Sequence, residues 1–498
     1  WSAWIMPLIM HSLLFVAVFL VFMSLSTIVR WHWNDVQRLQ YPLVMPIASM
    51  IEEGEKGEAF GRFWRDKVVW LGMLVPIIYS GLNGLNRYFP QVPTVGFALD
   101  IGDLMPAGAL KSGFKLYPPF ILELRYPSML AIGYLMPTGV SLSMWLFYIL
   151  YKLWTSAQYA IGTSLVGSGM GVHKFRAVEA AQMSGAAFAL TFMYLWLARD
   201  KVKGMFKELF GKSSTRHDIN EPLSSKGTII GGLLGFTFIV FFYSGLQYAS
   251  LWWVLYFMLA FFAVSFTLGR LRAEIGLPDS TITGKDIYAG VGWYMPPAML
   301  GENNIAFIGA HYWDYTYSQL QSIMAICLDA IKLGDTANIS RRKLTAALLI
   351  AMVLAGALGM VFTLRTVYEY GGEIMGYLID RPLSQLKTAD SQWEKENNMF
   401  EYALYFLGAG AGATLLLGHL AFRFVWWPLH PVGYFMASYS SMRNFWFLFF
   451  LAWLLKVGIF RYGGTKLHQK AVPFFVGILA GGGLMDAFWQ IVALIVGR

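Results

Sequence analysis

Long apolar runs recur along the whole chain, and short polar or charged segments separate them. Runs of about 18–25 apolar residues are long enough to cross a hydrocarbon core of roughly 30 Å. The pattern predicts ten such spans, over 4–29, 68–85, 128–153, 177–198, 228–246, 251–268, 344–364, 402–424, 445–460 and 473–496. Shorter apolar stretches, typical of half-helices or re-entrant segments, lie at 41–51, 157–172, 291–308, 320–333 and 428–439.

The charges between the runs indicate an orientation in the membrane. The segment 199–226 carries seven Lys or Arg and 30–67 carries six, so both are expected in the cytoplasm. The segment 365–398 is richer in acid and is expected outside. The sides assigned to these loops are consistent only if the chain crosses the membrane once more. The candidate for this crossing is the stretch 157–172, whose residues are small and polar, and we expect it to be a broken or re-entrant element. The expected fold is an all-α, polytopic transmembrane helix bundle of about 10–12 crossings, including broken or re-entrant helices.

The whole chain, 1–498, is predicted to be one integral membrane domain. The long loop 86–126 contains several Pro and Gly and a β-like run at 120–124, and it is expected to form an extracytoplasmic cap. The chain begins at Trp1 rather than Met, so the N-terminal part of the natural protein is expected to be missing.

Composition agrees with a membrane protein. Hydrophobic residues make up 57% of the chain and charged residues 13%, whereas a soluble domain carries about a quarter charged residues. The net charge of +9 comes mainly from short segments between spans, so the expected partner is the lipid bilayer and not nucleic acid. The single cysteine, Cys327, excludes an intrachain disulfide and a thiolate metal cluster.

Small residues four positions apart indicate close helix packing. They are Ala181 with Gly185 and Ala189, Gly231 with Gly235, Gly408 with Gly412, and Gly477 with Gly481. Such spacing lets helix backbones approach closely in a membrane. Tight packing is the favoured interpretation, and a glycine-lined pathway is the alternative.

Motifs of soluble enzymes are absent from the sequence. It contains no G-x-x-x-x-G-K-[ST] phosphate loop, no H-E-x-x-H, no Cys/His cluster and no G-x-S-x-G. We therefore expect no enzyme, no cofactor and no metal site.

Ionisable residues beside apolar runs are the candidates for function, because a charge at membrane depth is costly. Arg272 and Glu274 end an aromatic-rich span and are followed by the helix breakers Gly276 and Pro278. They can pair, and the break can expose backbone groups that bind an ion or a carboxylate. The alternative is an interfacial anchor that stops the helix.

Three further residues extend this set of candidates. Asp486 is the charged residue of the final span and is a candidate for ion or proton coupling, although it can equally pair with an arginine or a helix terminus. His419, four residues before Arg423, can relay protons or be a hydrogen-bonded bundle histidine. Glu179, three residues before Gln182, is better explained by a solvated first turn.

Several motifs resemble a known group of proteins. They are WNDVQRLQYPL at 33–43, PSM at 127–129 with GYLMP at 133–137, RAEIGLP at 272–278, HPVGY at 430–434, RYGG at 461–464 and PFFVG at 473–477. On these motifs the chain resembles an uncharacterised group of bacterial and archaeal polytopic membrane proteins, distantly similar to the oligopeptide transporter superfamily. The resemblance implies a prokaryotic cytoplasmic (inner) membrane, further N-terminal spans and glycine-rich broken helices. The group usually has Glu where this chain has Gln37, which puts a pairing with Arg38 in doubt.

The leading hypothesis is a secondary transporter, coupled to protons or ions, for a small peptide-like or metal-chelate solute. Arg272, Glu274, His419 and Asp486 are expected to carry coupling, and Tyr134 with the broken helices is expected to shape the solute site. The alternative is a non-transporting accessory subunit of a larger membrane complex, which would make other subunits or a homo-oligomer its partners. A membrane enzyme acting on lipid needs a clustered acid or metal site that the sequence lacks.

Overall fold

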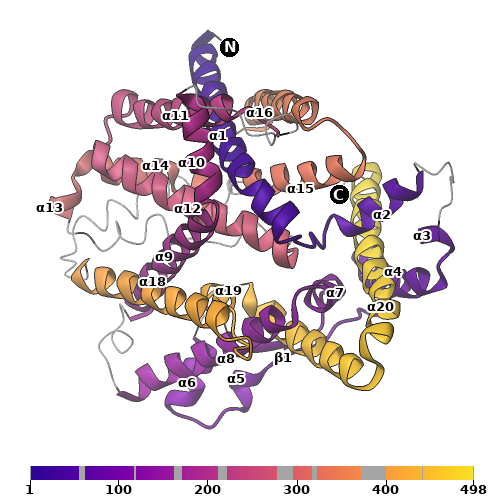
Figure 1. Cartoon of the computed structure of the whole chain (residues 1–498). Helices are drawn as coiled ribbons and strands as arrows, with labels where there is room; N and C mark the ends of the chain where they lie inside the picture. Colours follow the sequence, from indigo (N-terminus) through magenta and orange to yellow (C-terminus); the bar gives the residue numbers. More distant parts are fainter. Residues whose placement is uncertain are drawn as a thin grey trace. The chain divides into compact units, whose positions relative to one another are not determined.

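In a computed structural model, the described residues are 2–54, 62–116, 119–161, 171–210, 221–277, 295, 297–316, 322–371, 400–439 and 441–496. Most of them are helical (Figure 1). The helices are α1 Ser2–Arg30, η1 Trp31–Val36, α2 Met45–Gly54, α3 Arg62–Arg65, α4 Lys67–Tyr88, α5 Ile101–Leu104, α6 Ala109–Lys115, α7 Pro127–Leu135, α8 Thr138–Ile161, α9 Gly171–Leu197, α10 Arg199–Leu209, α11 Ser225–Val240, η2 Phe241–Leu246, α12 Leu251–Ile275, α13 Pro297–Leu300, α14 Glu302–Thr316, α15 Ile323–Thr336, α16 Arg341–Tyr370, α18 Phe400–Arg423, α19 Pro431–Met436 and α20 Met442–Val496.

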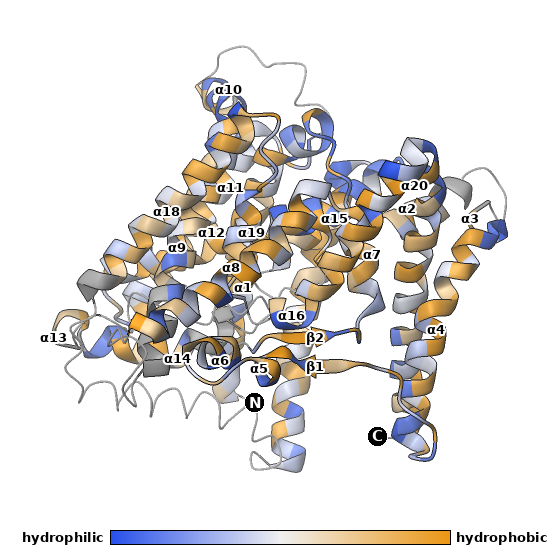
Figure 2. Ribbon diagram, turned by 90° about the horizontal axis from the view of Figure 1, so that it is seen from below, coloured by the Kyte–Doolittle hydropathy of each residue, from blue (hydrophilic) through white to orange (hydrophobic). Residues whose placement is uncertain are grey.

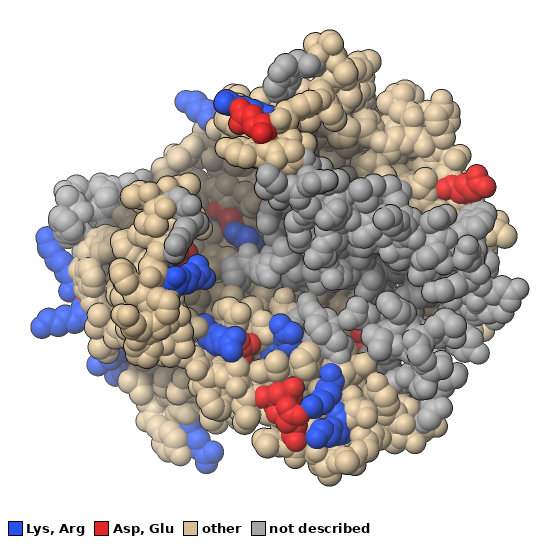
Figure 3. All heavy atoms as spheres, turned by 180° about the vertical axis from the view of Figure 1, so that it is seen from behind, with Lys and Arg blue, Asp and Glu red and all other residues tan. Residues whose placement is uncertain are grey.

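Apolar helices long enough to cross a membrane dominate the described part of the chain. Seven pass this test, and the bent pair formed by α9 and α10 raises the number to eight. Figure 2 shows the long helices coloured mainly as apolar. On the face drawn in Figure 3, most of the described surface belongs to neither Lys or Arg nor Asp or Glu. The predicted all-α polytopic helical bundle is therefore confirmed.

Most predicted spans coincide with one helix each, but 128–153 does not. The chain breaks between α7 and α8, where Met136 adopts an extended conformation with ψ of 159°. Pro137 follows Met136. The ring of a proline clashes with the preceding residue and disfavours helical backbone angles there. The prediction of one continuous span at this place was wrong.

The last two predicted spans, 445–460 and 473–496, are the two arms of α20. The arms meet at Gly464, whose φ of 62° is accessible to glycine at little cost. At the predicted acidic loop, α16 continues to Tyr370, and 372–399 lies outside the described residues. The predicted extra crossing at 157–172 also falls mostly outside them, since α8 ends at Ile161 and α9 begins at Gly171.

The predicted cap, 86–126, contains the only strands among the described residues. β1 Ala98–Asp100 pairs antiparallel with β2 Ile121–Glu123, which confirms the β-like run. The short helices α5 and α6 lie between the two strands in the sequence. Lys152 of α8 is fully buried and donates a hydrogen bond to the carbonyl of Leu116, 2.8 Å away, directly after α6. This contact fixes the cap segment to a long helix.

The chain forms two compact units, each built from discontinuous segments. The first comprises 1–39, 176–270 and 283–413, and the second comprises 40–175, 271–282 and 414–498. In the first unit α1 packs against α11, α15 and α16. In the second unit α20 packs against α4, α7 and α8, and Figure 1 shows the second arm of α20 beside α4.

Glycines bring helix backbones together within each unit. A Cβ added to Gly477 of α20 would lie 2.2 Å from the carbonyl oxygen of Val69 in α4, and one added to Gly72 would lie 2.0 Å from that of Phe474. Between α9 and α18 the corresponding distances are 1.9 Å from Gly185 to the carbonyl oxygen of Leu407 and 1.9 Å from Gly410 to that of Gln182.

The predicted packing residues are partly correct. Ala181, Gly185 and Ala189 are all buried in the first unit, as expected. The pair Gly408 and Gly412 was the wrong choice in α18, because no described atom lies within 4 Å of a Cβ added at either one. Both lie on the side of α18 that faces away from α9. On the side that faces α9, the contact is made by Gly410.

Candidate functional site

The break between α7 and α8 is the centre of the candidate site in the second unit. α7 ends when the backbone N–H of Met136 donates to the carbonyl of Ile132. The last carbonyls of a helix have no partner within it, and they carry the negative end of the helix dipole. The break therefore presents electronegative backbone groups inside a helical bundle.

Lys456, from the first arm of α20, satisfies one of these groups. Its Nζ atom donates to the carbonyl of Met136 at 2.8 Å, and its side chain is only 6% exposed. The ammonium also lies 5.7 Å from the centre of the Tyr134 ring. A buried lysine is expensive unless its charge has partners, and here the helix end and the aromatic face supply them.

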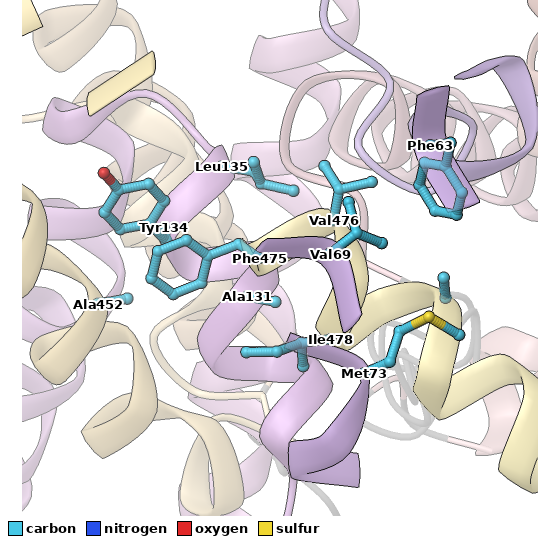
Figure 4. Close-up of a cluster of buried hydrophobic side chains, with 11 residues drawn as sticks. Phe63, Val69, Met73, Ala131, Tyr134, Leu135, Ala452, Phe475, Val476 and Ile478 are labelled. Carbon is cyan, nitrogen blue, oxygen red and sulfur yellow. The ribbon is translucent and has the colours of Figure 1, made fainter. Parts of the chain in front are cut away.

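Tyr134 connects this lysine to a histidine. Its hydroxyl lies 2.9 Å from Nδ1 of His468, which belongs to the second arm of α20. The Tyr134 ring stacks on Phe475 with 3.8 Å between ring centres, within a buried cluster that includes Ala131 and Ile478. In Figure 4 the hydroxyl points away from that apolar cluster. We call Tyr134, Lys456 and His468 the polar cluster.

A second group of polar side chains joins α8, α12 and α19. The backbone N–H of His430 donates to the hydroxyl of Ser143 at 2.7 Å, and the N–H of Val432 donates to Nδ1 of His430, which caps α19. The other ring nitrogen, Nε2, lies 3.7 Å from a carboxylate oxygen of Glu274. Because Nδ1 accepts a hydrogen bond, the proton of a neutral His430 sits on Nε2 and faces that carboxylate.

The end of the first motif also reaches this group. The N–H of Tyr41 donates to the carbonyl of Ala273 at 3.0 Å, and a Cβ added to Gly276 would lie 2.8 Å from the ring of Pro42. Gly276 has a φ of 71°, and Tyr41 has a φ of 49°, which is uncommon for a residue with a side chain. Residues of the motifs at 33–43, 272–278 and 430–434 thus contact one another within the second unit.

Some of the predicted site residues are buried in these groups and others are exposed. Tyr134 is fully buried in the polar cluster, and Glu274 is buried beside His430. Arg272 is partly buried two residues before Glu274 on α12. His419 and Asp486 are both exposed, on α18 and on the second arm of α20, so they do not join the buried groups. Their predicted role in coupling stays a prediction.

Three residues of this region escaped sequence reasoning, namely Lys456, His468 and His430. A usable signal was present for Lys456, since it is the single charge in an apolar run of aromatic and aliphatic residues from 445 to 460. Near His468 the sequence is polar, so nothing distinguishes it from a surface histidine. His430 lay inside a motif, but only the fold shows that it faces Glu274.

The first unit holds a separate buried ion network. Arg30 is 3% exposed and Glu221 is 2% exposed, and the guanidinium donates to both carboxylate oxygens at 2.7 and 3.0 Å. Arg30 also contacts Asp35 at 3.0 Å, and Lys201 of α10 pairs with Glu221. Burial raises the pKa of Glu221, but the hydrogen bonds and charges of Arg30 and Lys201 outweigh it and hold that pKa below its ordinary value.

Gln37 of the first motif has a partner in this unit. Its amide oxygen accepts a hydrogen bond from Arg270. The guanidinium of Arg270 lies 5.2 Å from the Trp33 ring and 4.7 Å from the Tyr194 ring. Arg38, the neighbour of Gln37, has a φ of 51° and belongs to the turn that follows η1.

Among the described residues, no group of three or more His, Cys, Asp or Glu side chains is placed to hold a metal ion. The polar cluster combines an ammonium, an imidazole and a phenol, and its cationic ammonium suits an anionic group better than a metal ion. All three are titratable side chains, and they lie beside a helix break.

Comparison with known proteins gives a family for the chain. No curated protein matches the sequence. A family model, described as a family of unknown function (DUF6785), matches residues 1–498. The chain therefore belongs to the DUF6785 family.

Proposed function

We propose that the protein is a secondary membrane transporter in which protonation of Lys456 controls the α7–α8 break. One observation carries the proposal, namely the buried ammonium that donates to the Met136 carbonyl at the end of α7. In transporters, broken helices near the middle of the membrane coordinate coupling cations with unwound carbonyls and helix C-terminal ends. Lys456 supplies a covalently attached cation to the C-terminal end of α7.

The coupling follows from the charge of the lysine. A protonated Lys456 binds the electronegative end of α7, and a neutral one loses most of this attraction. The titratable groups that face it among the described residues are Tyr134 on α7 and His468 on α20. These two groups share a hydrogen bond, so they can exchange a proton with each other beside the lysine. Loss of the proton would free the break to change conformation, which links proton movement to solute movement.

The class of solute and the membrane rest on the resemblance of the motifs. Similarity to the oligopeptide transporter superfamily favours a small peptide-like or metal-chelate solute, and the similar bacterial and archaeal proteins favour a prokaryotic inner membrane. We propose transport without chemical conversion of the solute, so the protein would not be an enzyme.

Proteoliposomes test the proposal with two probes, radiolabelled trialanine and an iron(III)–citrate chelate. An inward proton gradient should drive accumulation of at least one probe by the wild-type protein. Lys456→Met should lose proton-driven accumulation but keep exchange of labelled for unlabelled probe, which shows that it is folded. The matched control is Lys470→Met, an exposed lysine on the same helix. Glu274→Gln tests the second polar group, and Asp486→Asn tests the exposed carboxylate.

The outcomes separate the parts of the proposal. If Lys456→Met accumulates the probe as well as the wild type does, the lysine does not couple transport to protons. If neither probe moves in either direction, the proposed transport of these two solute classes is wrong.

A second candidate function, an accessory subunit of a larger complex, is favoured by α16. The apolar window of this helix has no buried residue, although it is one of the most hydrophobic spans. Such a surface can face lipid or a neighbouring subunit. Mass spectrometry of the protein extracted in native membrane patches tests this candidate, and a single protein without partners would contradict it.

A further inference from the structure

The helix α10 leaves the membrane-crossing direction of α9 at a sharp angle. The two helices are bent by 63° where Ala198 interrupts the helical conformation. Six of the eleven residues of α10 are charged, and Figure 2 colours it largely as hydrophilic. A segment so charged does not cross a hydrocarbon core, because each charge at membrane depth is costly. The bend therefore turns the chain out of the hydrocarbon region.

One side of α10 packs on the protein. Met205 is 4% exposed, and Lys201 on the same side is occupied by its ion pair with Glu221. α10 also contacts α11 in the same unit. These contacts fix the rotation of the helix about its axis, and so they determine which residues face outward.

The outward side combines two lysines with two phenylalanines. Lys203, Phe206, Lys207 and Phe210 are all exposed, with Phe206 at 47% and Phe210 at 78%. Their spacing of i, i+3, i+4 and i+7 places them on one side of a helix. We call these four residues the α10 face. Two adjacent exposed phenylalanines are unfavourable in water, and two lysines beside them are unfavourable in the membrane interior.

The corner between α9 and α10 bears a marker of the membrane interface. Trp196, at the end of α9, is 56% exposed, and the guanidinium of Arg199 lies 5.0 Å from its ring. Tryptophan is enriched at the level of the lipid head groups, and arginine extends toward them. The first turn of α10 holds one exposed acid, Asp200, where the helix dipole favours a negative charge.

We propose that α10 lies in the interfacial layer of the bilayer and binds anionic lipid head groups through Lys203 and Lys207, with Phe206 and Phe210 inserted toward the acyl chains. On such a face, lysines can extend toward the head groups while the neighbouring aromatic rings insert toward the acyl chains, as in other basic helices that bind membrane surfaces. The charge of the lysines complements an anionic surface, and the phenylalanines require a partner with an apolar layer beneath that surface. The proposal does not depend on any transport activity.

The test places a fluorescent probe on the α10 face. Cys327 is the single cysteine and is 2% exposed, so a probe directed to Phe210→Cys labels the new thiol selectively. The labelled full-length protein is placed in nanodiscs of phosphatidylcholine alone or with 30% phosphatidylglycerol. Nitroxides on lipid head groups and acrylamide in the water report the two environments of the probe. Acrylamide is neutral, so an anionic surface does not repel it.

We expect the probe to be quenched by the head-group nitroxides and protected from acrylamide. Each lysine near an anionic surface contributes about 1 kcal/mol, a factor of about five. The variant Lys203→Gln with Lys207→Gln should therefore lower the ratio of docked to undocked α10 about 30-fold with phosphatidylglycerol, and much less without it. Asp200→Asn is the matched control of opposite sign and should not weaken docking.

Two results would overturn the proposal. One is a probe at position 210 that acrylamide quenches freely in both lipid mixtures. This would show that the α10 face is exposed to water, and it would favour a protein partner for that face. The other is equal docking of the double variant and the wild type with phosphatidylglycerol, which would show that the lysines do not bind anionic lipid.

Discussion

The close approach of α4 and α20 predicts opposite effects on stability when two glycines of α20 are each replaced by alanine. Gly477 faces the backbone of α4, where an added Cβ would lie 2.2 Å from the carbonyl oxygen of Val69. Gly483, six residues later in the same arm, is exposed, and no described atom lies within 4 Å of a Cβ added there. We compare Gly477→Ala with Gly483→Ala.

The magnitude follows from the geometry. Ordinary contact begins at 3.4 Å, so the difference between 3.4 and 2.2 Å requires the two helices to separate by about 1.2 Å at Val69. The obstacle is backbone and cannot rotate away. Overpacking of this kind costs about 1–3 kcal/mol. At Gly483 no contact is lost, and alanine stabilises a helix by about 0.5–1 kcal/mol relative to glycine.

The assay is thermal stability in a single detergent. Each variant is heated for a fixed time and the monodisperse fraction is measured by size-exclusion chromatography, because large membrane proteins commonly unfold irreversibly. We expect Gly477→Ala to lose its monodisperse fraction at a lower temperature than the wild type does. Gly483→Ala should match or exceed the wild type. The reasoning is refuted if Gly477→Ala is as stable as Gly483→Ala.

Three further predictions concern the first unit, where a thiol-reactive dye detects unfolding through the buried Cys327. Glu221→Gln should destabilise the protein by about 3–5 kcal/mol at neutral pH, because it removes the buried carboxylate and leaves the buried Arg30 guanidinium with the exposed carboxylate of Asp35. Since the pKa of Glu221 is lowered by folding, the wild type should lose this advantage as the pH falls below the ordinary carboxyl pKa, and an equal acid response of the variant would contradict this. Gly410→Ala should destabilise and Gly412→Ala should not, and equal stability of the two variants would contradict the packing. Arg270→Lys should cost about 1–2 kcal/mol, because lysine lacks the planar group that stacks on two rings, and an unchanged unfolding temperature would contradict that role.

Apolar run length predicted most of the long helices correctly. Runs such as 4–29 and 68–85 exceed what a strand or a loop can hold, so length alone decides their structure. The π-helix η1 at Trp31–Val36 escaped prediction, because a widened turn leaves the hydrophobic pattern almost unchanged. The break at Met136 was readable from Pro137, but the apolar residues on both sides hid it.

The candidate site was harder to predict than the fold. Glu274 and Tyr134 stood in motifs, whereas their partners His430 and His468 lie 156 and 334 positions away in the sequence. Pairings over such distances depend on tertiary packing, which a single sequence does not encode in any local pattern. Asp486 was predicted to be a coupling residue because it is a charge in an apolar run. The pattern of buried and exposed residues along α20 shows that its side chain faces outward.

The contact between α4 and α20 also has a consequence for biosynthesis. Gly72 and Gly477, which bring the two backbones together, are separated by about four hundred residues of chain. At roughly 5–20 residues per second, the ribosome needs about 20–80 s to produce the second helix after the first. During that interval the glycine side of α4 must be covered by lipid, the insertion machinery or a temporary helix neighbour. A membrane chaperone that retains the nascent chain would therefore be expected to release it only after Gly477 has emerged.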